Sequence, residues 1–170
     1  MNTKNSPTMQ ASFLDRINKN VGFVVWSGIG TGSLATILDY FDKPEYQVQR
    51  VIMPRVSNDT FMVMPVLDAN KQIGQYISNE MQAIKTARDT SGKKLVLIFD
   101  DLSSSTVAGS RAFYDAVINR KFGGIDLNDT DIVLAVGSLD SEGNMINNVI
   151  PQMLLNKVSH YVLHHAELTA

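Results

Sequence analysis

The chain contains no cysteine among its 170 residues, which excludes disulfides and thiolate metal sites and is compatible with a reducing compartment. It also lacks a metal motif, because its three histidines, His160, His164 and His165, cluster near the C-terminus and neighbours in a strand point to opposite faces. No apolar run approaches the length of a membrane span, and the polar start MNTKNSPTMQ has no signal-peptide core. We therefore expect a cytoplasmic protein with no membrane partner.

Charge is sparse and mixed in sign, with charged residues making up 19% of the chain and a formal net charge of −2. Lysine and arginine form no run, and the densest basic pair, Lys93 and Lys94, is typical of the solvated start of a strand. Nucleic acid is therefore not indicated as a partner. The length is that of one core, so we expect a leader with a short helix over residues 1–20 and an α/β domain over residues 21–170.

Five short apolar runs rich in valine, isoleucine and phenylalanine predict strands. They are GFVVWS (22–27), VQRVIM (48–53), KLVLIF (94–99), DIVLAV (131–136) and HYVLHH (160–165). Three of these runs are nearly continuous in hydrophobicity, which indicates strands buried on both faces of a parallel sheet. Apolar residues recur at helical spacing within residues 71–89 and 105–122. Alternating strands and helices predict an α/β fold with right-handed crossovers.

Three further segments are interpreted from their composition. Residues 123–131, GGIDLNDTD, predict a loop or tight hairpin, and residues 138–144, SLDSEGN, predict another loop. The methionine-rich stretch FMVMPV (61–66) is typical of gap-filling core or interface material, because methionine adapts to irregular surfaces.

A glycine-rich turn, SGIGTGSL (27–34), follows the first predicted strand and opens a helix, where phosphate is usually held. The phosphate loop G-x-x-x-x-G-K-[ST] places Ser27 at the first glycine, Gly32 at the second, Ser33 at the lysine and Leu34 at the hydroxyl residue. The candidate cofactor-binding residues are Gly28, Gly30, Thr31, Gly32, Ser33 and Leu34.

Two adjacent carboxylates end the third predicted strand, in KKLVLIFDDLSSS (93–105). In phosphate-loop enzymes the first acid at this place helps to hold Mg²⁺, and a following glutamate orients the attacking water. Asp100 and Asp101 occupy these two places, so Asp100 is the candidate metal ligand if Mg²⁺ is bound.

With the glycine turn and the acid pair, the chain resembles the AAA+ ATPases, and within them the MoxR-like branch. The segments VLIFDDLSSSTVAGSRAFYDAVINRKFGG, DIVLAVGSLDSEGNMINNVIPQMLLNKVSHYVLH and RVSNDTFMVMPVLD carry the rest of the resemblance, which covers about residues 20–165. It implies a three-layer P-loop NTPase core with a five-stranded parallel sheet of order 5-1-4-3-2. It also implies ATP and Mg²⁺ at the mouth of the first strand and subunits packed side by side in a ring.

The working residues of that family are mostly replaced here. Ser33 stands where the family has its phosphate-binding lysine, and Leu34 has no oxygen for a hard cation. Asp101 is one methylene shorter than the catalytic glutamate, Ser138 replaces the polar sensor, and Lys157 stands where arginine is usual. We therefore expect no catalytic residue to be functional, with Asp100, Asp101, Ser138 and Lys157 as vestiges. No bound cofactor is expected, and ATP with Mg²⁺ is the alternative.

The family also continues into a small helical lid, whereas the sequence ends at Ala170 just past the fifth predicted strand, so we expect no lid. The interpretation is a structural or regulatory subunit, forming a homo-oligomer or an assembly with a related protein. Residues 1–12 and 61–66 are the expected contact segments. Two alternatives stay open: an ATP-binding protein with weak or partner-assisted ATPase activity, and a nucleotide sensor without turnover. A lidless, altered ATPase also suits a virus or mobile element, within a viral assembly.

Two other interpretations of these motifs are weaker. A dinucleotide fingerprint G-x-G-x-x-G would lose its last glycine at Ser33 and finds no acid in VIMPR after the second predicted strand, although Arg55 could meet a 2′-phosphate. A nucleophilic serine in GSRAF or SSST has no histidine placed to activate it, and SSST is typical of helix-capping material.

Overall fold

The computed structural model describes residue 16, residues 22–61 and residues 63–163. The predicted leader lies outside these residues apart from position 16, as do His164 and His165. The elements in chain order are β1 (Phe23–Gly28), α2 (Ser33–Phe41), β2 (Tyr46–Ile52), η1 (Met53–Arg55), β3 (Met64–Leu67), β4 (Ile73–Tyr76), α3 (Asn79–Ser91), β5 (Lys94–Asp100), η2 (Leu102–Ser104), α4 (Val107–Ile118), β6 (Lys121–Phe122), β7 (Ile125–Asp126), β8 (Ile132–Leu139), α5 (Gln152–Leu155) and β9 (Ser159–Leu163).

Five strands form one parallel sheet, in the order β2-β5-β8-β1-β9. These labels differ from the expected 5-1-4-3-2, because two hairpins, β3–β4 and β6–β7, add four strands that the expectation did not number. Along the chain the strands of this sheet are β1, β2, β5, β8 and β9. When these five strands are numbered one to five in chain order and read from the β9 edge, their order in the sheet is 5-1-4-3-2. β1 therefore lies inside the sheet.

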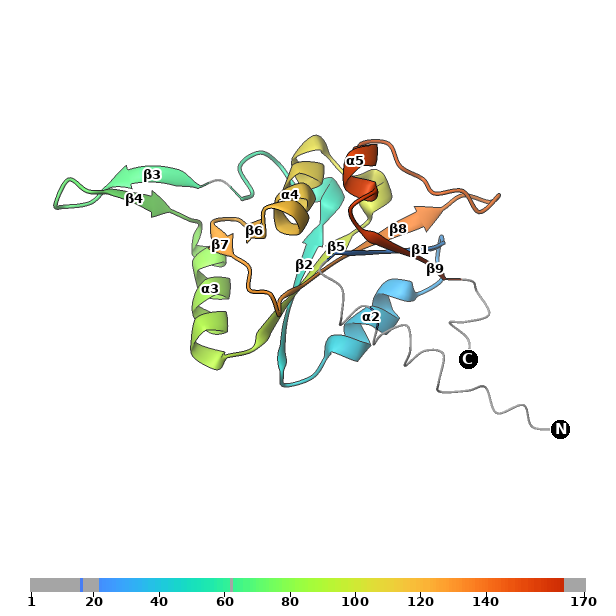
Figure 1. Ribbon diagram of the computed structural model, residues 1–170, viewed down its shortest axis with the longest axis horizontal. Helices are drawn as coiled ribbons and strands as arrows, with labels where there is room; N and C mark the ends of the chain where they lie inside the picture. Colours follow the sequence, from blue (N-terminus) through green and yellow to red (C-terminus); the bar gives the residue numbers. More distant parts are fainter. Residues whose placement is uncertain (1–15, 17–21, 62, 164–170) are drawn as a thin grey trace.

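Helices cover both faces of this sheet (Figure 1). On one face, Ile37 and Phe41 of α2 pack with Phe23 and Val25 of β1. On the other face, α3, α4 and α5 contribute to a larger apolar cluster that includes Val24 and Trp26 of the same strand. Successive residues of a strand point to opposite faces, so a strand covered on both sides is apolar at every position. Burial on both faces therefore explains the near-continuous apolar runs in the sequence.

Trp26 and Gly137 face each other in neighbouring strands and set how closely these strands pack. Both residues occupy the same register position of the β1–β8 pair, and the Trp26 side chain is fully buried. A Cβ atom added to Gly137 would lie 2.5 Å from Cζ3 of the Trp26 ring. The ring therefore occupies the space that any other side chain at position 137 would need.

A buried carboxylate joins three segments at the amino ends of β5 and β8. Asp131 accepts hydrogen bonds from the backbone N–H groups of Leu95, at 2.9 Å, and Asn128, at 2.7 Å, and pairs with Arg88. Arg120 donates to the Asp131 carbonyl at 3.0 Å, and burial lowers the pKa of Arg120 although Asp131 opposes this. These bonds satisfy a charge that burial would otherwise penalise.

The helix predicted over residues 71–89 is wrong in its first part. Ile73 and Tyr76 lie in strand β4, and α3 begins at Asn79 after Ser78, whose hydroxyl accepts a bond from the Met81 backbone N–H. The serine cap satisfies an N–H group that has no partner within the helix, so it sets the helix start. The helix predicted over 105–122 is likewise shorter: α4 ends at Ile118, and residues 121–126 form the tight hairpin β6–β7.

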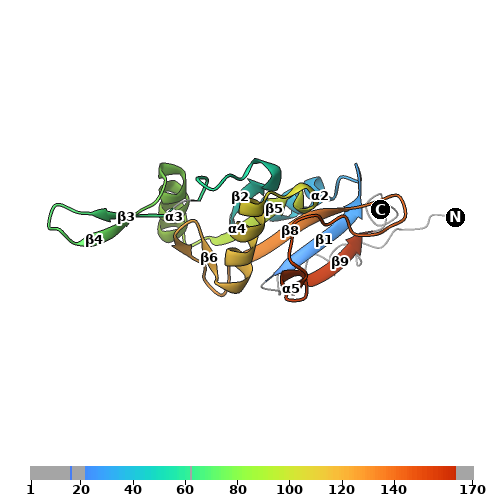
Figure 2. The same ribbon diagram turned by 90° about the horizontal axis from the view of Figure 1, so that it is seen from above.

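The hairpin β3–β4 extends away from the sheet and helices, at one end of the molecule (Figures 1 and 2). Met64 and Val66 are exposed, so these two positions of the predicted methionine-rich segment are not core residues. β8 continues to Leu139, into the segment 138–144 that was expected to be a loop, and a turn over Asp140–Asn144 follows it. Among the residues that the structure describes, no helix combines the length and apolar character needed to cross a membrane.

Candidate functional site

A cleft of about 420 Å³ opens at the carboxyl ends of β1, β5 and β8. Its lining consists of the glycine turn and residues at the carboxyl ends of β5 and β8: Ser27, Gly28, Ile29, Gly30, Thr31, Gly32, Ser33, Leu34, Asp100, Asp101, Ser104, Val136, Gly137 and Ser138. Carboxyl ends of neighbouring parallel strands meet at one edge of a sheet, which is where such folds place their ligands. The predicted loop residues, both acids and Ser138 are therefore brought together.

Lys157 does not line this cleft. It is exposed and lies between α5 and β9, just before the amino end of β9. Because β1 and β9 are parallel, with Phe23 opposite Ser159, this end of β9 lies beside the start of β1 and away from the glycine turn. Any contact of Lys157 with a glycine turn would have to be made to another molecule.

The backbone of the turn has the shape that an anion-binding loop needs. Gly30 and Gly32 adopt φ angles of 79° and 76°, a left-handed conformation that glycine adopts without strain. The Thr31 backbone N–H donates to the Gly28 carbonyl at 3.3 Å, which closes the turn. Gly32 is the N-cap of α2, and no side chain caps this helix. The first N–H groups of α2 therefore have no side-chain acceptor at the edge of the cleft.

Ser33, at the position where the phosphate-loop pattern has a lysine, is turned into the protein. Its hydroxyl lies 2.7 Å from the hydroxyl of Ser27, and both serines are buried. The residues that line the cleft include no lysine, arginine or histidine. The cleft thus has backbone N–H groups at the start of a helix but no side-chain cation to balance the charge of a phosphate.

Asp100 is held by an arginine that the sequence analysis did not identify. The Asp100 carboxylate accepts hydrogen bonds from Arg50 Nε, at 3.0 Å, and from Arg50 Nη2. Arg50 lies in β2, where Ile52 is paired with Asp100 in the sheet register, so the ion pair crosses neighbouring strands. A guanidinium group therefore neutralises the carboxylate that was expected to face a metal ion.

The donor set does not fit a magnesium ion. One oxygen of Asp100 is engaged by Arg50, Leu34 supplies no oxygen, and Asp101 Oδ1 accepts a hydrogen bond from the Ser104 hydroxyl at 2.9 Å. Across residues 22–61 and 63–163, no three histidine, aspartate or glutamate side chains lie together as a metal site would need. Magnesium in nucleotide sites is held by one or two protein oxygens together with waters and substrate phosphates, but here the carboxylate at the metal position is engaged by Arg50 and the hydroxyl position is an apolar leucine.

Two other polar residues of the cleft, Asp101 and Ser138, make hydrogen bonds to neighbouring serines of the same chain. Asp101 has a φ angle of 60°, which is uncommon for a residue with a side chain, and its carboxylate accepts a hydrogen bond from the hydroxyl of Ser104, the last residue of η2. The Ser138 backbone N–H donates to the hydroxyl of buried Ser103 at 2.8 Å. Hydroxyl groups of the segment SSST thus hold together the ends of β5 and β8, a role that the sequence did not reveal.

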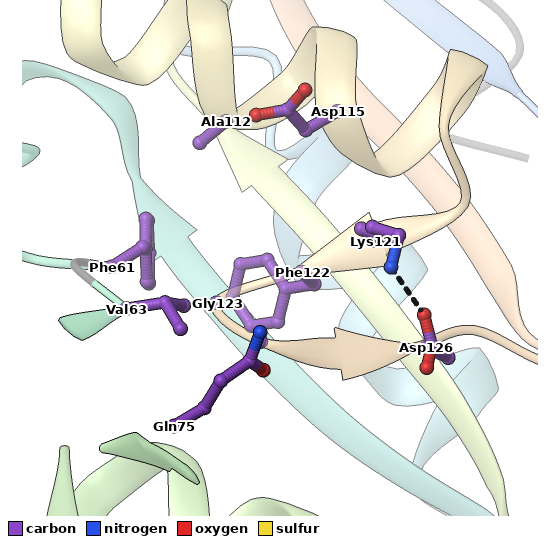
Figure 3. Close-up of a pocket in the computed structure, with 10 residues that line it drawn as sticks. Phe61, Val63, Gln75, Ala112, Asp115, Lys121, Phe122, Gly123 and Asp126 are labelled. Atoms are coloured by element: carbon purple, nitrogen blue, oxygen red, sulfur yellow. Dashed lines mark ion pairs between the residues drawn. The ribbon is translucent and has the colours of Figure 1, made fainter. Parts of the chain in front are cut away.

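A second cavity, of about 310 Å³, lies between α4, the segment before β3 and the hairpin β6–β7 (Figure 3). Phe61, Val63 and Phe122 supply apolar surface, with the Phe61 and Phe122 ring centroids 4.7 Å apart. Lys121 and Asp126 form an exposed ion pair at 2.9 Å, and the hydrogen bond from Lys121 lowers the pKa of Asp126. This cavity offers contact surface rather than reacting groups.

Comparison with known proteins yields a fold and no family. No family model matches the chain, and no curated protein matches it in sequence. The fold is similar to the crystal structure of NtrX from Brucella abortus, with a TM-score of 0.54 and 10% sequence identity. The likeness covers 96% of this chain and 38% of the NtrX chain, so this chain spans well under half of that protein's length. The chain thus has an α/β fold with a parallel sheet, which is compatible with a P-loop-type core.

Proposed function

We propose that the chain is a degenerate AAA+-type domain, similar to the MoxR-like branch, which does not hydrolyse ATP and serves as a structural or regulatory subunit of an assembly. The observation that carries this proposal is the content of the cleft at the end of β1. The cleft retains a left-handed glycine turn at the start of a helix, but Ser33 is bonded to Ser27 and Asp100 is paired with Arg50.

Phosphoryl transfer depends on positioning and on cations that neutralise the charge of the transferring group. A lysine and a metal ion supply these cations in phosphate-loop enzymes. Here the lysine position carries a buried hydroxyl, and the metal position carries a carboxylate that is already neutralised. Two functions of such a site are therefore replaced by contacts within the chain.

Hydrolysis of ATP by the purified protein tests the inactive part of the proposal. We expect release of phosphate from ATP with Mg²⁺ to equal that of a buffer blank, for the wild type and for Asp100→Asn alike. Turnover by the wild type that is lost in Asp100→Asn would contradict the proposal. Val107→Lys is a matched surface control, because Val107 is exposed on α4 and does not line the cleft.

One alternative has specific support, namely weak ATP binding with or without assisted hydrolysis. The first N–H groups of α2 have no side-chain cap, and such groups attract anions even without a lysine. Calorimetry with ATP, in the presence and absence of Mg²⁺, separates the two hypotheses. Binding without turnover would favour a nucleotide sensor, whereas no binding would leave assembly as the function.

The assembly role is supported by what the fold leaves exposed. Five large apolar side chains are exposed on a single element, the hairpin β3–β4: Met64, Val66, Leu67, Ile73 and Tyr76. Clusters of exposed apolar side chains often mark contacts with other proteins. The molar mass in solution, measured by light scattering with and without ATP, tests this role. A strict monomer at high concentration that binds ATP tightly would favour the sensor.

A further inference from the structure

The hairpin β3–β4 exposes apolar side chains on both of its faces. Met64 and Val66 of β3 share one face with Tyr76 of β4, whereas Leu67 and Ile73 share the other. Leu67 is 71% exposed and Ile73 is 80% exposed, and Met64, Val66 and Tyr76 are exposed as well. A two-stranded hairpin is marginally stable in water unless further strands or another layer pack against it.

The hairpin β6–β7 provides the contrast within the same chain. It is shorter, yet Phe122 and Ile125 are buried in the core cluster. β3 and β4 contribute no residue to either core cluster and extend away from the body (Figures 1 and 2). The apolar faces of β3–β4 are therefore not covered by the residues that the structure describes.

The hydrogen-bond pattern of the hairpin shows which backbone groups are free. The Asp68 backbone N–H donates to the Gln72 carbonyl at 3.0 Å, so Asp68 and Gln72 form a hydrogen-bonded pair. Such pairs alternate along an antiparallel ladder, so Gly74 and Tyr76 bond inward to β3. The N–H and C=O groups of Ile73 and Gln75 consequently point away from β3, to the outer edge of β4.

The two outer edges of the hairpin differ in their capacity to pair. On β3 the outward positions are Pro65 and Leu67, and proline has no N–H to donate. On β4 both outward residues have an N–H group, and no charged residue lies between Ile73 and Tyr76. Natural proteins commonly protect an edge strand with charge, proline or a bulge, and the β4 edge has no charge or proline.

We propose that the β4 edge pairs with the β4 edge of a second copy of this chain, in an antiparallel, two-fold arrangement that forms a four-stranded sheet β3-β4-β4-β3. This inference rests on the proposed assembly role and adds to it the contact surface and the partner. Gly74 lies on the two-fold axis, opposite Gly74 of the other copy. Ile73 of each copy is paired with Gln75 of the other, and the two pairs supply four backbone hydrogen bonds.

Charge complementarity supports a second copy as the occupant. In this register Lys71, in the turn of one hairpin, lies opposite Ile77 of the other copy, at the base of its hairpin. Glu80 follows Ile77 by three residues, in the first turn of α3, and is exposed. In the proposed dimer, Lys71 of each copy lies on the side of the contact where α3 of the other copy begins with Glu80, and the two-fold axis makes this relation reciprocal. The contact is isologous, so it closes at two copies.

Charge substitutions at the proposed contact test the pairing and its register. In a Lys variant, Ile73→Lys with Gln75→Lys, lysines face each other across the axis in both pairs. We expect the dissociation constant of the dimer to rise at least about tenfold, because like charges directly opposite destabilise paired strands. The same is expected of a Glu variant, Ile73→Glu with Gln75→Glu. An equimolar mixture of the two variants should restore the dimer as a heterodimer.

Met153→Lys is the matched control, since Met153 is exposed outside the hairpin and its substitution should leave the dimer unchanged. A cysteine offers a second measurement that does not perturb the edge by charge. The chain has no cysteine, and opposing Cα atoms of a non-hydrogen-bonded pair lie about 4.5 Å apart. Gly74→Cys should therefore form an intermolecular disulfide on mild oxidation, whereas Ile29→Cys, exposed in the glycine turn, should not.

The outcomes separate this contact from the wider proposal. A dimer or larger assembly that is unaffected by the Lys variant would overturn the hairpin contact and leave the assembly role intact. A wild type that is monomeric at every concentration would overturn both. A monomer whose Ile73 and Gln75 amides are protected from hydrogen exchange would assign the edge to a segment of the same chain, and it would also overturn the pairing.

Discussion

Replacing Ser33 by alanine removes one hydroxyl of a buried pair and leaves the other without a partner. The Ser27 and Ser33 hydroxyl oxygens lie 2.7 Å apart, and these residues are only 4% and 5% exposed. A buried polar group that loses its partner destabilises a protein by about 1–3 kcal/mol. We expect the free energy of unfolding of Ser33→Ala, and equally of Ser27→Ala, to fall by this amount.

The double variant distinguishes this explanation from a simple loss of packing. When both hydroxyls are removed, no unpartnered polar atom remains, so the double variant should lose less stability than the two single variants together. The difference should be about 1 kcal/mol, which is a typical coupling energy for residues in contact.

Urea unfolding followed by circular dichroism measures these free energies. The fluorescence of Trp26, the only tryptophan and the residue before Ser27, offers an independent probe. The exposed Ser159→Ala serves as control and should change stability by less than about 0.5 kcal/mol. Additive losses in the double variant would refute the claim that Ser33 is engaged by Ser27, and with it one argument for the inactive cleft.

Two further predictions concern the close packing of the sheet and a turn beside the cleft. Gly137→Ala should lower the free energy of unfolding by about 1–3 kcal/mol in urea titrations, because its Cβ would lie 2.5 Å from the buried Trp26 ring. Gly74→Ala, which has no neighbour closer than 3.8 Å, is the control, and equal losses would contradict the explanation. The pKa of Asp140 is lowered by hydrogen bonds from Asn144, so its contribution to stability is present above its usual pKa of 3.8 and is lost as the pH falls through the lower folded-state value. NMR titration of the Asp140 carboxyl carbon checks this, and a midpoint at or above 3.8 would exclude the turn geometry.

The strands of the sheet were predictable because burial on both faces produces a simple apolar pattern in the sequence. A strand buried on both faces is apolar at every position, as in Leu95–Phe99 of β5. The predicted bounds differ from the observed ones by at most three residues at the ends that the structure describes. The glycine turn was predictable for a related reason, since Gly30 and Gly32 adopt positive φ angles that other residues avoid.

The hairpin β3–β4 was not predictable from apolar spacing. Ile73 and Tyr76 lie three residues apart, as do Met81 and Ile84, so all four fit one helical face. Only Met81 and Ile84 are buried in the core; Ile73 and Tyr76 lie on an exposed strand that pairs with β3. Gly74 and the cap residue Ser78 were the local signals against a continuous helix.

The sequence by itself determined which chemical groups end the strands: a glycine turn without a lysine after β1, two aspartates after β5 and a serine near the end of β8. These are local properties, because composition and chain order specify them. The tertiary structure decided what each group contacts. Arg50 and Asp100 are 50 residues apart, and the register of β2 against β5 places them in one ion pair. The turn of the chain between β1 and α2 places Ser33 against Ser27. The Arg50–Asp100 pair depends on how two separate strands align in three dimensions, whereas the Ser27–Ser33 contact depends on the backbone conformation of the turn that joins them.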